Sequence, residues 1–348
     1  MINIHQTYNF ARCFLNYKVG HPTPFQVHFE VTDRCNLRCK FCDIWKRKNE
    51  EVNLEQAKKI IDNISEAKIS IITLTGGEPL LRNDLEDIAS YAKSKGMIAQ
   101  LNTNGTLLTK ERVKKIAESF DWVGISLDGL EETHDGIRGI KGTFNKAVKG
   151  VKNLNEVKGN CKVAIASVLT KDNYNELIPL FRQAKKLGVD FAYVHPVVEV
   201  SFSNPENFGV FPSKRCGVNL VEMNKFIKKL VKEKSKDYGF ILVLESFIEL
   251  MPTFIKGDVP RICDAGKLFL AVNPKGDLFF CPQLIGNNSF KMGSLLKSPL
   301  TKILNQKNMK KFMELTKNCR CLSLCTTGTS LTFREPLINL IKQSTKFL

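Results

Sequence analysis

The stretch VTDRCNLRCKFCDIWK, residues 31–46, places three cysteines in the spacing C-x3-C-x2-C directly after an apolar segment. These cysteines are Cys35, Cys39 and Cys42. Three thiolates on one short loop can bind three irons of a [4Fe–4S] cluster, whereas a closed electron-transfer cluster needs four thiolates. The loop would leave one iron open, and an open metal position is typical of a catalytic site. A zinc ion with its fourth ligand elsewhere in the chain is the alternative.

The composition predicts a folded, non-secreted protein. The chain has 348 residues, of which 43% are hydrophobic and 25% are charged, so a sizeable core can form and global disorder is excluded. No apolar run approaches the roughly 20 residues of a membrane span. Asn3, His5 and Gln6 stand where a signal peptide needs an apolar segment. Eleven cysteines in such a chain indicate metal or iron–sulfur sites rather than a disulfide scaffold.

The net charge of +17, from 52 Lys and Arg against 35 Asp and Glu, attracts anionic partners. A lysine-rich solvated surface is the alternative explanation. Nucleic acid is disfavoured as a partner, because the lysines are scattered over helices and no recognition module is visible.

Strands and helices alternate along residues 25–195. The strands are nearly continuous in apolar character, as buried parallel strands are, and parallel strands need crossover helices. This predicts a parallel sheet covered by helices, although periodicity alone does not separate an open sheet from a partial barrel. The expected strands are 25–31, 69–74, 97–101, 122–127, 162–169 and 191–195, and the expected helices are 53–67, 84–95, one opened by Thr109, 143–157 and 174–187.

Short polar motifs follow successive predicted strands. Residues 75–79 read TGGEP, residues 102–105 read NTNG, residues 126–129 read SLDG, and residues 134–139 read HDGIRG. Together with the cysteine loop and its aromatic Phe41, these motifs resemble the radical S-adenosylmethionine (radical SAM) superfamily, in particular its subgroup with auxiliary clusters. The resemblance covers roughly residues 25–200. It implies a partial (β/α)6 TIM-like barrel, an α/β fold whose ligand sites lie at the carboxyl ends of the strands.

The resemblance also implies the chemistry. The open iron of the [4Fe–4S] cluster would chelate S-adenosylmethionine, and one electron would cleave it to methionine and a 5′-deoxyadenosyl radical that abstracts hydrogen from an unreactive C–H bond. The protein would supply orientation and exclude water. Such clusters are oxygen-labile, so we expect an enzyme that works in an anaerobic or reducing cytoplasm.

The resemblance assigns cofactor-binding roles to the motif residues. Gly76 and Gly77 would let backbone approach the methionine part closely, Glu78 would accept from its ammonium group, and Pro79 would fix the turn. The remaining candidates are Asn102, Asn104, Ser126 and Asp128 for ribose hydroxyls or the carboxylate, Arg138 for the carboxylate, and Phe41 for the adenine. The alternatives are turn shaping for Gly76, Gly77, Pro79 and Asp128, loop capping for Asn102 and Asn104, and a surface pair of Arg138 with Asp135. His195 is either a structural residue or a substrate contact.

A second cysteine group lies near the C-terminus. Cys263 and Cys281 stand at the outer ends of two apolar runs that flank residues 273–277, which predicts a β-hairpin. This segment resembles the SPASM and twitch auxiliary-cluster domains. Since one [4Fe–4S] cluster needs four thiolates, we expect one auxiliary cluster on Cys263, Cys281 and two later cysteines. The later cysteines are Cys319, Cys321 and Cys325, of which Cys321 and Cys325 are favoured; structural zinc is the alternative.

The sequence divides into five expected segments. They are an N-terminal amphipathic segment at 1–24, the radical SAM core at 25–215, a helical connection at 216–260, the auxiliary-cluster domain at 261–330 and an amphipathic basic tail at 331–348. Basic amphipathic ends can lie on anionic membranes, so the first hypothesis for the substrate is a lipid or other membrane-associated molecule, with peripheral attachment to the inner face of the membrane. Packing of both ends on the barrel is the alternative.

Two further functions stay open. One is the maturation of a peptide or protein substrate; only 24 residues precede the first expected strand, too few for the leader-binding domain that such enzymes often carry, although a separate chain can supply one. The other is a non-catalytic iron–sulfur electron carrier, which the glycines and Glu78 disfavour because a carrier needs no amino-acid cradle. The enzyme would need an external electron donor such as flavodoxin or ferredoxin.

Overall fold

The computed structural model describes residues 4–47, 50–201, 209–212, 217–236, 239–317, 319–323 and 327–335. Within these ranges one sheet runs in the order β11-β10-β9-β1-β2-β3-β4-β5-β6. Its neighbours from β1 to β6 are parallel, as the sequence predicts. These strands are β1 (Gln26–Thr32), β2 (Ile71–Gly76), β3 (Ile98–Thr103), β4 (Trp122–Ser126), β5 (Lys162–Leu169) and β6 (Phe191–Pro196).

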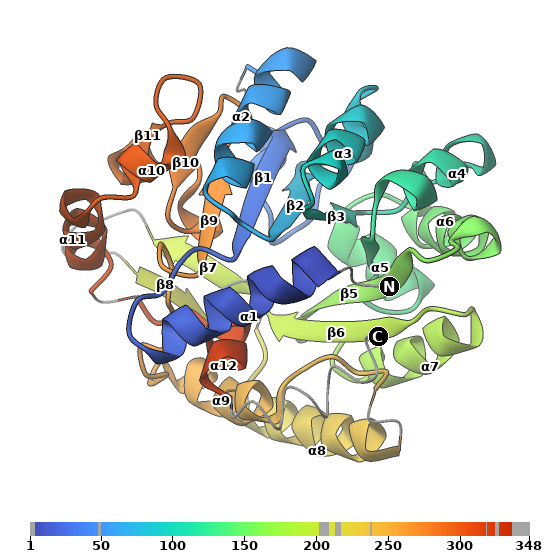
Figure 1. The fold of residues 1–348 in the computed structure, drawn as a ribbon. Helices are drawn as coiled ribbons and strands as arrows, with labels where there is room; N and C mark the ends of the chain where they lie inside the picture. Colours follow the sequence, from blue (N-terminus) through green and yellow to red (C-terminus); the bar gives the residue numbers. More distant parts are fainter. Residues whose placement is uncertain are drawn as a thin grey trace.

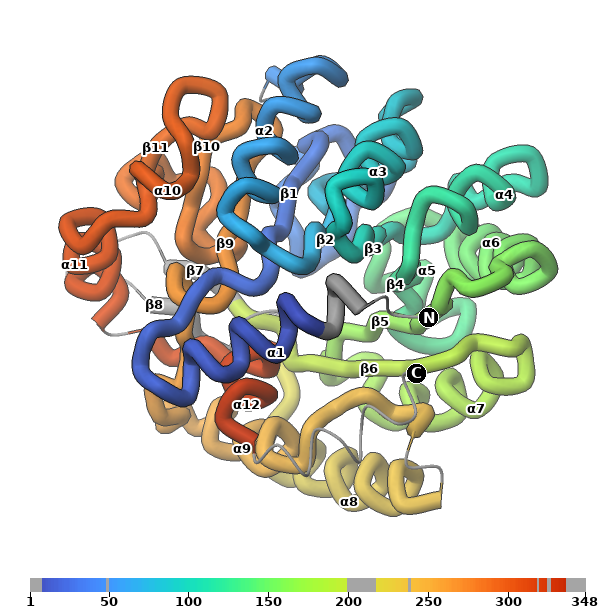
Figure 2. The backbone as a smooth tube through the Cα atoms, viewed as in Figure 1, coloured from blue at the N-terminus to red at the C-terminus, as the bar shows by residue number. Residues whose placement is uncertain are grey.

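Helices connect the parallel strands and cover their outer face (Figure 1). They are α2 (Leu54–Glu66), α3 (Leu85–Ser94), α4 (Lys110–Ser119), α5 (Glu131–Arg138), α6 (Thr143–Val157) and α7 (Leu177–Lys186). The tube in Figure 2 shows the chain passing around the barrel in sequence order from α2 to α7. The partial (β/α)6 barrel is therefore confirmed, and α5 is an addition that the sequence does not predict.

Strand β1 shows how the barrel separates its two faces. Val27, Phe29 and Val31 alternate along it and are fully buried in the hydrophobic core. The side chains between them point to the opposite face, where the Gln26 amide donates to the Thr73 hydroxyl at 2.9 Å. The barrel interior is therefore polar on this wall, and it can hold a polar ligand.

The C-terminal segment extends the sheet beyond β1. Strand β9 (Phe269–Val272) pairs in parallel with β1, while β10 (Asp277–Phe279) and β11 (Lys291–Ser294) continue antiparallel. The predicted hairpin over residues 269–279 is confirmed, but its attachment to β1 was not expected. The other elements of this segment are η4 (Pro282–Leu284), η5 (Asn288–Phe290), α10 (Leu300–Ile303), α11 (Gln306–Leu315) and α12 (Thr329–Arg334).

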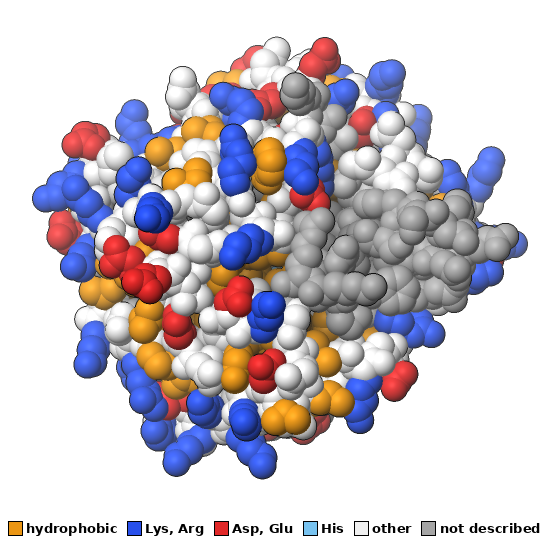
Figure 3. Space-filling view, turned by 180° about the vertical axis from the view of Figure 1, so that it is seen from behind, with side chains coloured by type: hydrophobic (Ala, Val, Ile, Leu, Met, Phe, Trp, Pro, Cys, Tyr) orange, Lys and Arg blue, Asp and Glu red, His pale blue; other side chains and the backbone are white. Residues whose placement is uncertain are grey.

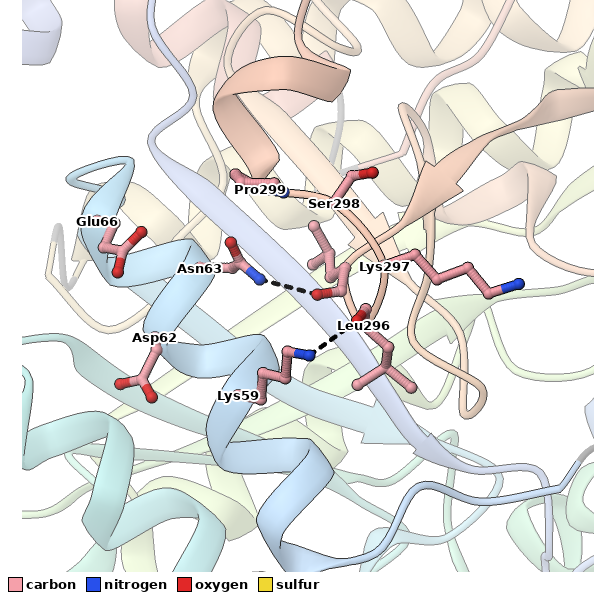
Figure 4. Close-up of a pocket in the computed structure, with 9 residues that line it drawn as sticks. Lys59, Asp62, Asn63, Glu66, Leu296, Lys297, Ser298 and Pro299 are labelled. Atoms are coloured by element: carbon pink, nitrogen blue, oxygen red, sulfur yellow. Dashed lines mark hydrogen bonds between the residues drawn. The ribbon is translucent and has the colours of Figure 1, made fainter.

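Helix α2 joins the barrel to this C-terminal segment. Asn63 donates to the Leu295 carbonyl at 2.8 Å and Lys59 donates to the Leu296 carbonyl at 2.9 Å (Figure 4). A surface cavity of about 260 Å³ lies between these groups, and none of the predicted site residues lines it. The cavity therefore lies at the contact between α2 and the C-terminal segment.

Helix α1 (Ile4–Lys18) packs on the barrel rather than away from it. Its Phe10, Phe14 and Tyr17 rings contact Phe333 of α12, and Phe10 also contacts Phe25. Figure 1 shows α1 and α12 side by side. The alternative that the N-terminal segment packs on the barrel is thus confirmed for these aromatic residues. Of the predicted tail, residues 336–348 lie outside the described residues.

The connecting region 198–256 holds a small hairpin and two helices. Strands β7 (Val198–Ser201) and β8 (Gly209–Pro212) pair antiparallel. Helices α8 (Leu220–Lys236) and α9 (Glu245–Lys256) follow. None of the described helices is long and apolar enough to cross a membrane. Lysine and arginine side chains are spread over the face seen in Figure 3.

Candidate active site

The three-cysteine loop follows β1 at its carboxyl end, and its thiols act on one another electrostatically. The pKa of Cys35 is raised to about 11, first by burial and then by the negative charges of Glu78 and the other two thiolates. Burial likewise raises the pKa of Cys42, and the Cys39 thiolate adds to the effect. Neutral thiols are therefore favoured in the isolated chain, and a cationic cluster would relieve this mutual repulsion.

Strand β2 holds the loop on one side. The Gly77 amide donates to the Thr32 carbonyl and the Glu78 amide donates to the Arg34 carbonyl, both at 2.8 Å. A Cβ at Gly76, whose φ is +132°, would collide with the Thr32 carbonyl, and one at Gly77 would collide with the Arg34 carbonyl. Both glycines are required by the approach of the cysteine loop itself, which is a different reason from the predicted approach to methionine.

Helix α5 holds the loop on the other side. The amide of Arg38 donates to the Arg138 carbonyl at 3.1 Å, and the amide of Lys40 donates to the Ile137 carbonyl at 3.0 Å. A Cβ at Gly139, whose φ is +78°, would collide with the Arg38 carbonyl. The last turn of α5 therefore supplies carbonyl acceptors that the loop backbone needs.

The Glu78 carboxylate is fully buried and organises the strand ends. It accepts from the Thr103 hydroxyl at 2.7 Å and from the amides of Asn104 and Leu80 at 2.7 and 3.0 Å. Burial raises its pKa. A carboxylate has about four acceptor sites, so one is left for a ligand ammonium group. The predicted contact with S-adenosylmethionine stays a prediction.

The other predicted side chains at the strand ends lie near this centre. Asn104 donates to the Asn36 amide oxygen at 2.8 Å, which ties the end of β3 to the cysteine loop. Asn102 stands in register with Gly124 on β4, and Ser126 is the half-buried last residue of β4. Pro79 is buried and opens the short helix η2 (Pro79–Leu81).

Asp128 and Arg138, both predicted to contact the ligand, form a buried ion pair with each other. Arg138 Nη2 lies 2.6 Å from Asp128 Oδ2, and Arg138 Nη1 donates to Cys39 Sγ at 3.7 Å. Burial alone would lower the pKa of Arg138, but Asp128 and the Cys39 thiolate raise it above its usual range. The Arg138 guanidinium also lies 5.4 Å from the Phe41 ring centroid. Arg138 thus positions the cysteine loop.

The surface pair of Arg138 with Asp135, the alternative from the sequence, is wrong. Asp135 instead accepts hydrogen bonds from the amides of Gly142 and Phe144 at the start of α6. A helix N-terminus leaves amides unsatisfied, and the carboxylate fills that need.

Sequence reasoning missed two buried groups beside the site. His134 Nδ1 accepts from the Asp128 amide at 3.1 Å, and burial lowers the His134 pKa to about 4. Glu30 on β1 pairs with Arg47 at 2.7 Å, and burial raises the Glu30 pKa to about 7. A carboxylate inside an apolar strand was the available signal for Glu30.

His195, on β6, is half-buried with Nδ1 3.0 Å from the Pro196 carbonyl oxygen.

The cysteines of the second group also act on one another electrostatically. Cys281 is buried, and its pKa is raised well above the usual value by burial and then by Cys263, Cys321 and Cys319. Four thiolates are enough for one [4Fe–4S] cluster. Cys319 and Cys321 thus both act on Cys281, although in the described part of the chain no three His, Cys, Asp or Glu side chains lie close enough together to hold a metal ion. The preference for Cys321 with Cys325 stays a prediction. Cys325 lies outside the described residues.

Replacing Cys281 with alanine is expected to lower the iron content from about eight to about four atoms per chain, because one four-iron site loses a ligand. The cysteine loop is untouched, so part of the uncoupled cleavage of S-adenosylmethionine should persist. Iron analysis and 5′-deoxyadenosine quantification check both expectations. An unchanged iron content would exclude Cys281 as a ligand.

Comparison with known proteins identifies the family. A family model of the radical SAM superfamily matches residues 29–184, and a model of the SPASM iron–sulfur cluster-binding domain matches residues 263–327. An AdoMet-dependent heme synthase of Methanosarcina barkeri is 36% identical over 279 residues, which cover 76% of this chain and 79% of that protein. The chain belongs to the radical SAM superfamily and carries a SPASM domain.

Other relatives match over different lengths. An Fe-coproporphyrin III synthase of Methanosarcina barkeri is 38% identical over 159 residues, 44% of this chain and 39% of that protein. The mycofactocin maturase MftC of Mycolicibacterium smegmatis is 28% identical over 286 residues, 80% of this chain and 69% of that protein. The match therefore covers less than half of the length of the Fe-coproporphyrin III synthase.

Solved structures show the same fold. SuiB of Streptococcus suis bound to S-adenosylmethionine superposes with a TM-score of 0.69 at 16% identity, covering 94% of this chain and 79% of that chain. SuiB bound to its precursor peptide SuiA gives 0.68 at 17% identity, covering 96% and 79%.

Family membership gives the cofactors: a [4Fe–4S] cluster, S-adenosylmethionine and auxiliary iron–sulfur binding. The donor sets fit these groups, because thiolates are the ligands that such clusters take. Zinc, the alternative from the sequence for both cysteine groups, is not what the family carries.

Proposed function

We propose that this chain is a radical SAM enzyme that modifies a C–H bond of a peptide substrate. The observation that supports the chemistry is the position of the three-cysteine loop between β2 and α5. Arg138 donates a hydrogen bond to Cys39 Sγ in this loop. When bound, the reduced cluster supplies the electron that cleaves S-adenosylmethionine to methionine and a 5′-deoxyadenosyl radical.

The residues of the chain have distinct proposed tasks. Cys35, Cys39 and Cys42 hold the cluster, and Arg138 orients the loop through Asp128. The ligand would lie against the backbone of residues 76–79 and the polar groups of Asn102, Asn104 and Ser126. Phe41 would stack on the adenine. Cys263, Cys281, Cys319 and Cys321 would hold one auxiliary cluster.

A peptide is favoured over a lipid by the placement of α1. The lipid hypothesis depended on the amphipathic ends, yet α1 contacts Phe25, and Arg12 donates to the Lys68 carbonyl at 2.8 Å. Both contacted residues precede their strands, whereas the cysteine loop follows β1, so α1 and the loop lie at opposite ends of the barrel. The maturase MftC, similar over 80% of this chain, supports the peptide hypothesis.

A tetrapyrrole is the second candidate substrate. The heme synthase of Methanosarcina barkeri is more similar in sequence, at 36% identity over 76% of this chain, than the maturase. A non-catalytic electron carrier is disfavoured, because Glu78 keeps an acceptor site next to the loop. We place the enzyme in the cytoplasm, where cysteine thiols stay reduced and can bind clusters.

Anaerobic incubation of the reconstituted protein with dithionite and S-adenosylmethionine tests the proposal. We expect 5′-deoxyadenosine by mass spectrometry, and its absence would contradict the proposed chemistry. Parallel incubations with Fe-coproporphyrin III and with candidate precursor peptides separate the substrates. Consumption of the porphyrin with a shifted visible spectrum would replace the peptide by the tetrapyrrole.

A further inference from the structure

Helix α8 has one buried side and one side that faces outward. It packs against α7 and α9 in the outer layer of the molecule (Figure 1). Its Met223, Phe226 and Leu230 are fully buried in the hydrophobic core. Because these three residues recur at helical spacing, the opposite side of α8 lies on the surface.

The outward side of α8 carries lysines and valines. Val221, Lys225, Lys228 and Lys232 follow one another at steps of three or four residues, so they share one side of the helix, and all four are exposed. Val221 is exposed by 62%, and Val231, exposed by 47%, borders the same side. We call these five side chains the lysine face. They extend over about 16 Å along the helix axis.

The acidic residues of α8 lie away from the lysine face and have other partners. Glu222 accepts from the Asn219 amide at 3.0 Å at the start of the helix. Glu233 accepts from Arg182 of α7 at 2.6 Å, and the Lys236 ammonium lies 3.4 Å from it. In the described part of the chain, no ion pair engages the three lysines of the face.

The neighbouring helices leave this positive charge in place. The sequence of α7, LIPLFRQAKK, contains no acidic residue, and its Arg182 and Lys186 are exposed. Helix α9 carries Glu245 and Glu249, both exposed, and Glu245 acts electrostatically on Lys234. Lys234 is buried on the inner side of α8, so this attraction is not directed at the lysine face.

The two valines distinguish between the anionic partners that such a face could bind. The phosphates of nucleic acids and of lipid headgroups both attract lysines. An exposed valine gains nothing from a phosphate backbone, but it is stabilised at the boundary between headgroups and acyl chains. A convex helix can also place all five side chains on a flat surface at once. A membrane surface therefore fits the lysine face better than a nucleic acid does.

We propose that the lysine face is the docking surface for a membrane that contains anionic lipids. The lysines contact the headgroups of phosphatidylglycerol or related lipids, and Val221 and Val231 enter the boundary below the headgroups. This attachment differs from the one expected from the two ends of the chain, because α8 lies within the sequence. It does not depend on the proposed function, since docking requires neither the clusters nor S-adenosylmethionine.

The test measures co-sedimentation of the full chain with vesicles made of phosphatidylcholine and phosphatidylglycerol in equal parts. Lys225→Gln with Lys228→Gln and Lys232→Gln removes the charge of the lysine face, while glutamine keeps the helix propensity of lysine. Each lysine near an anionic surface raises the binding constant about fivefold. We therefore expect the variant to bind on the order of a hundredfold more weakly than the wild type. High salt should reduce this difference.

The matched control changes the net charge by the same amount on another helix. Lys110→Gln with Lys114→Gln and Lys115→Gln alters exposed lysines of α4, a helix that also exposes Glu111 and Glu118. This control should bind the vesicles nearly as well as the wild type, and thermal unfolding checks that both variants fold.

Three results would overturn the proposal. Equal losses in the two variants would show a response to total charge alone. Binding of the wild type to phosphatidylcholine vesicles as strongly as to the mixed vesicles would show that anionic lipid is not recognised. A wild-type chain that ignores the mixed vesicles but binds a duplex oligonucleotide through the same three lysines would replace the membrane by nucleic acid.

Discussion

Alanine at Cys39 is expected to remove the open cluster and, with it, all detectable cleavage of S-adenosylmethionine. Two thiolates cannot hold a four-iron cluster, and the Arg138 guanidinium would lose its contact to Sγ at 3.7 Å. The measurements are electron paramagnetic resonance of the reduced protein, iron content and 5′-deoxyadenosine by mass spectrometry. We expect about four irons to remain, those of the auxiliary site.

Cys161→Ala is the matched control for this variant. Cys161 is 3% exposed and packs in the hydrophobic core just before β5, away from both cysteine groups. The Cys161→Ala variant also loses one thiol group. It should keep both clusters and should still cleave S-adenosylmethionine. Cleavage that survives in Cys39→Ala would show that the loop is not the cluster site, and the assignment of the family's cofactor to these residues would fail.

The barrel could be predicted because its signals are local. Residues 143–157 and 162–169 were expected as a helix and a strand, and α6 and β5 have those bounds. Asn53 and Gln56 form a capping box at the start of α2, and the structure contains both of its hydrogen bonds. Periodicity and caps act over a few residues, so the sequence shows them directly.

The attachment of the C-terminal segment could not be predicted, because it depends on distant residues. Gln26 pairs with Phe269 and Phe29 pairs with Val272, across more than two hundred positions. A parallel partner leaves no local turn signal, unlike the hairpin around residues 273–277. Helix α5 was missed for another reason: it is short and contains Gly136, which lowers its helix propensity.

In the site, residue identities were predictable and their partners were not. The motifs place Glu78 and Asp128 just after the strands β2 and β4, while Arg138 ends helix α5. Glu78 accepts from the Thr103 hydroxyl because β2 pairs with β3. Asp128 contacts Arg138 because of the position that helix α5 takes beside the end of β4. Such contacts follow from tertiary packing, which no short motif records.

The glycine pair leads to the second large expected effect. Gly77→Ala is expected to displace the cysteine loop, because the added Cβ collides with the Arg34 carbonyl, one residue before Cys35. The Gly77 amide is bonded to Thr32 and the Glu78 amide to Arg34, so the strand cannot move away cheaply. Overpacking of this kind costs about 1–3 kcal/mol, roughly a tenfold to hundredfold loss of cluster occupancy. Iron content and paramagnetic resonance of the reduced protein measure it.

Gly136→Ala is the matched control, since an added Cβ there meets nothing within 4 Å and the residue lies inside helix α5. Alanine should stabilise that helix by about 0.5–1 kcal/mol and leave the cluster intact. Thermal unfolding of both variants separates loss of the cluster from loss of the fold. Because the auxiliary thiolates belong to the C-terminal segment and not to the cysteine loop, Gly77→Ala should keep about four irons. A fully loaded Gly77→Ala protein that cleaves S-adenosylmethionine normally would show that the loop does not need this close approach.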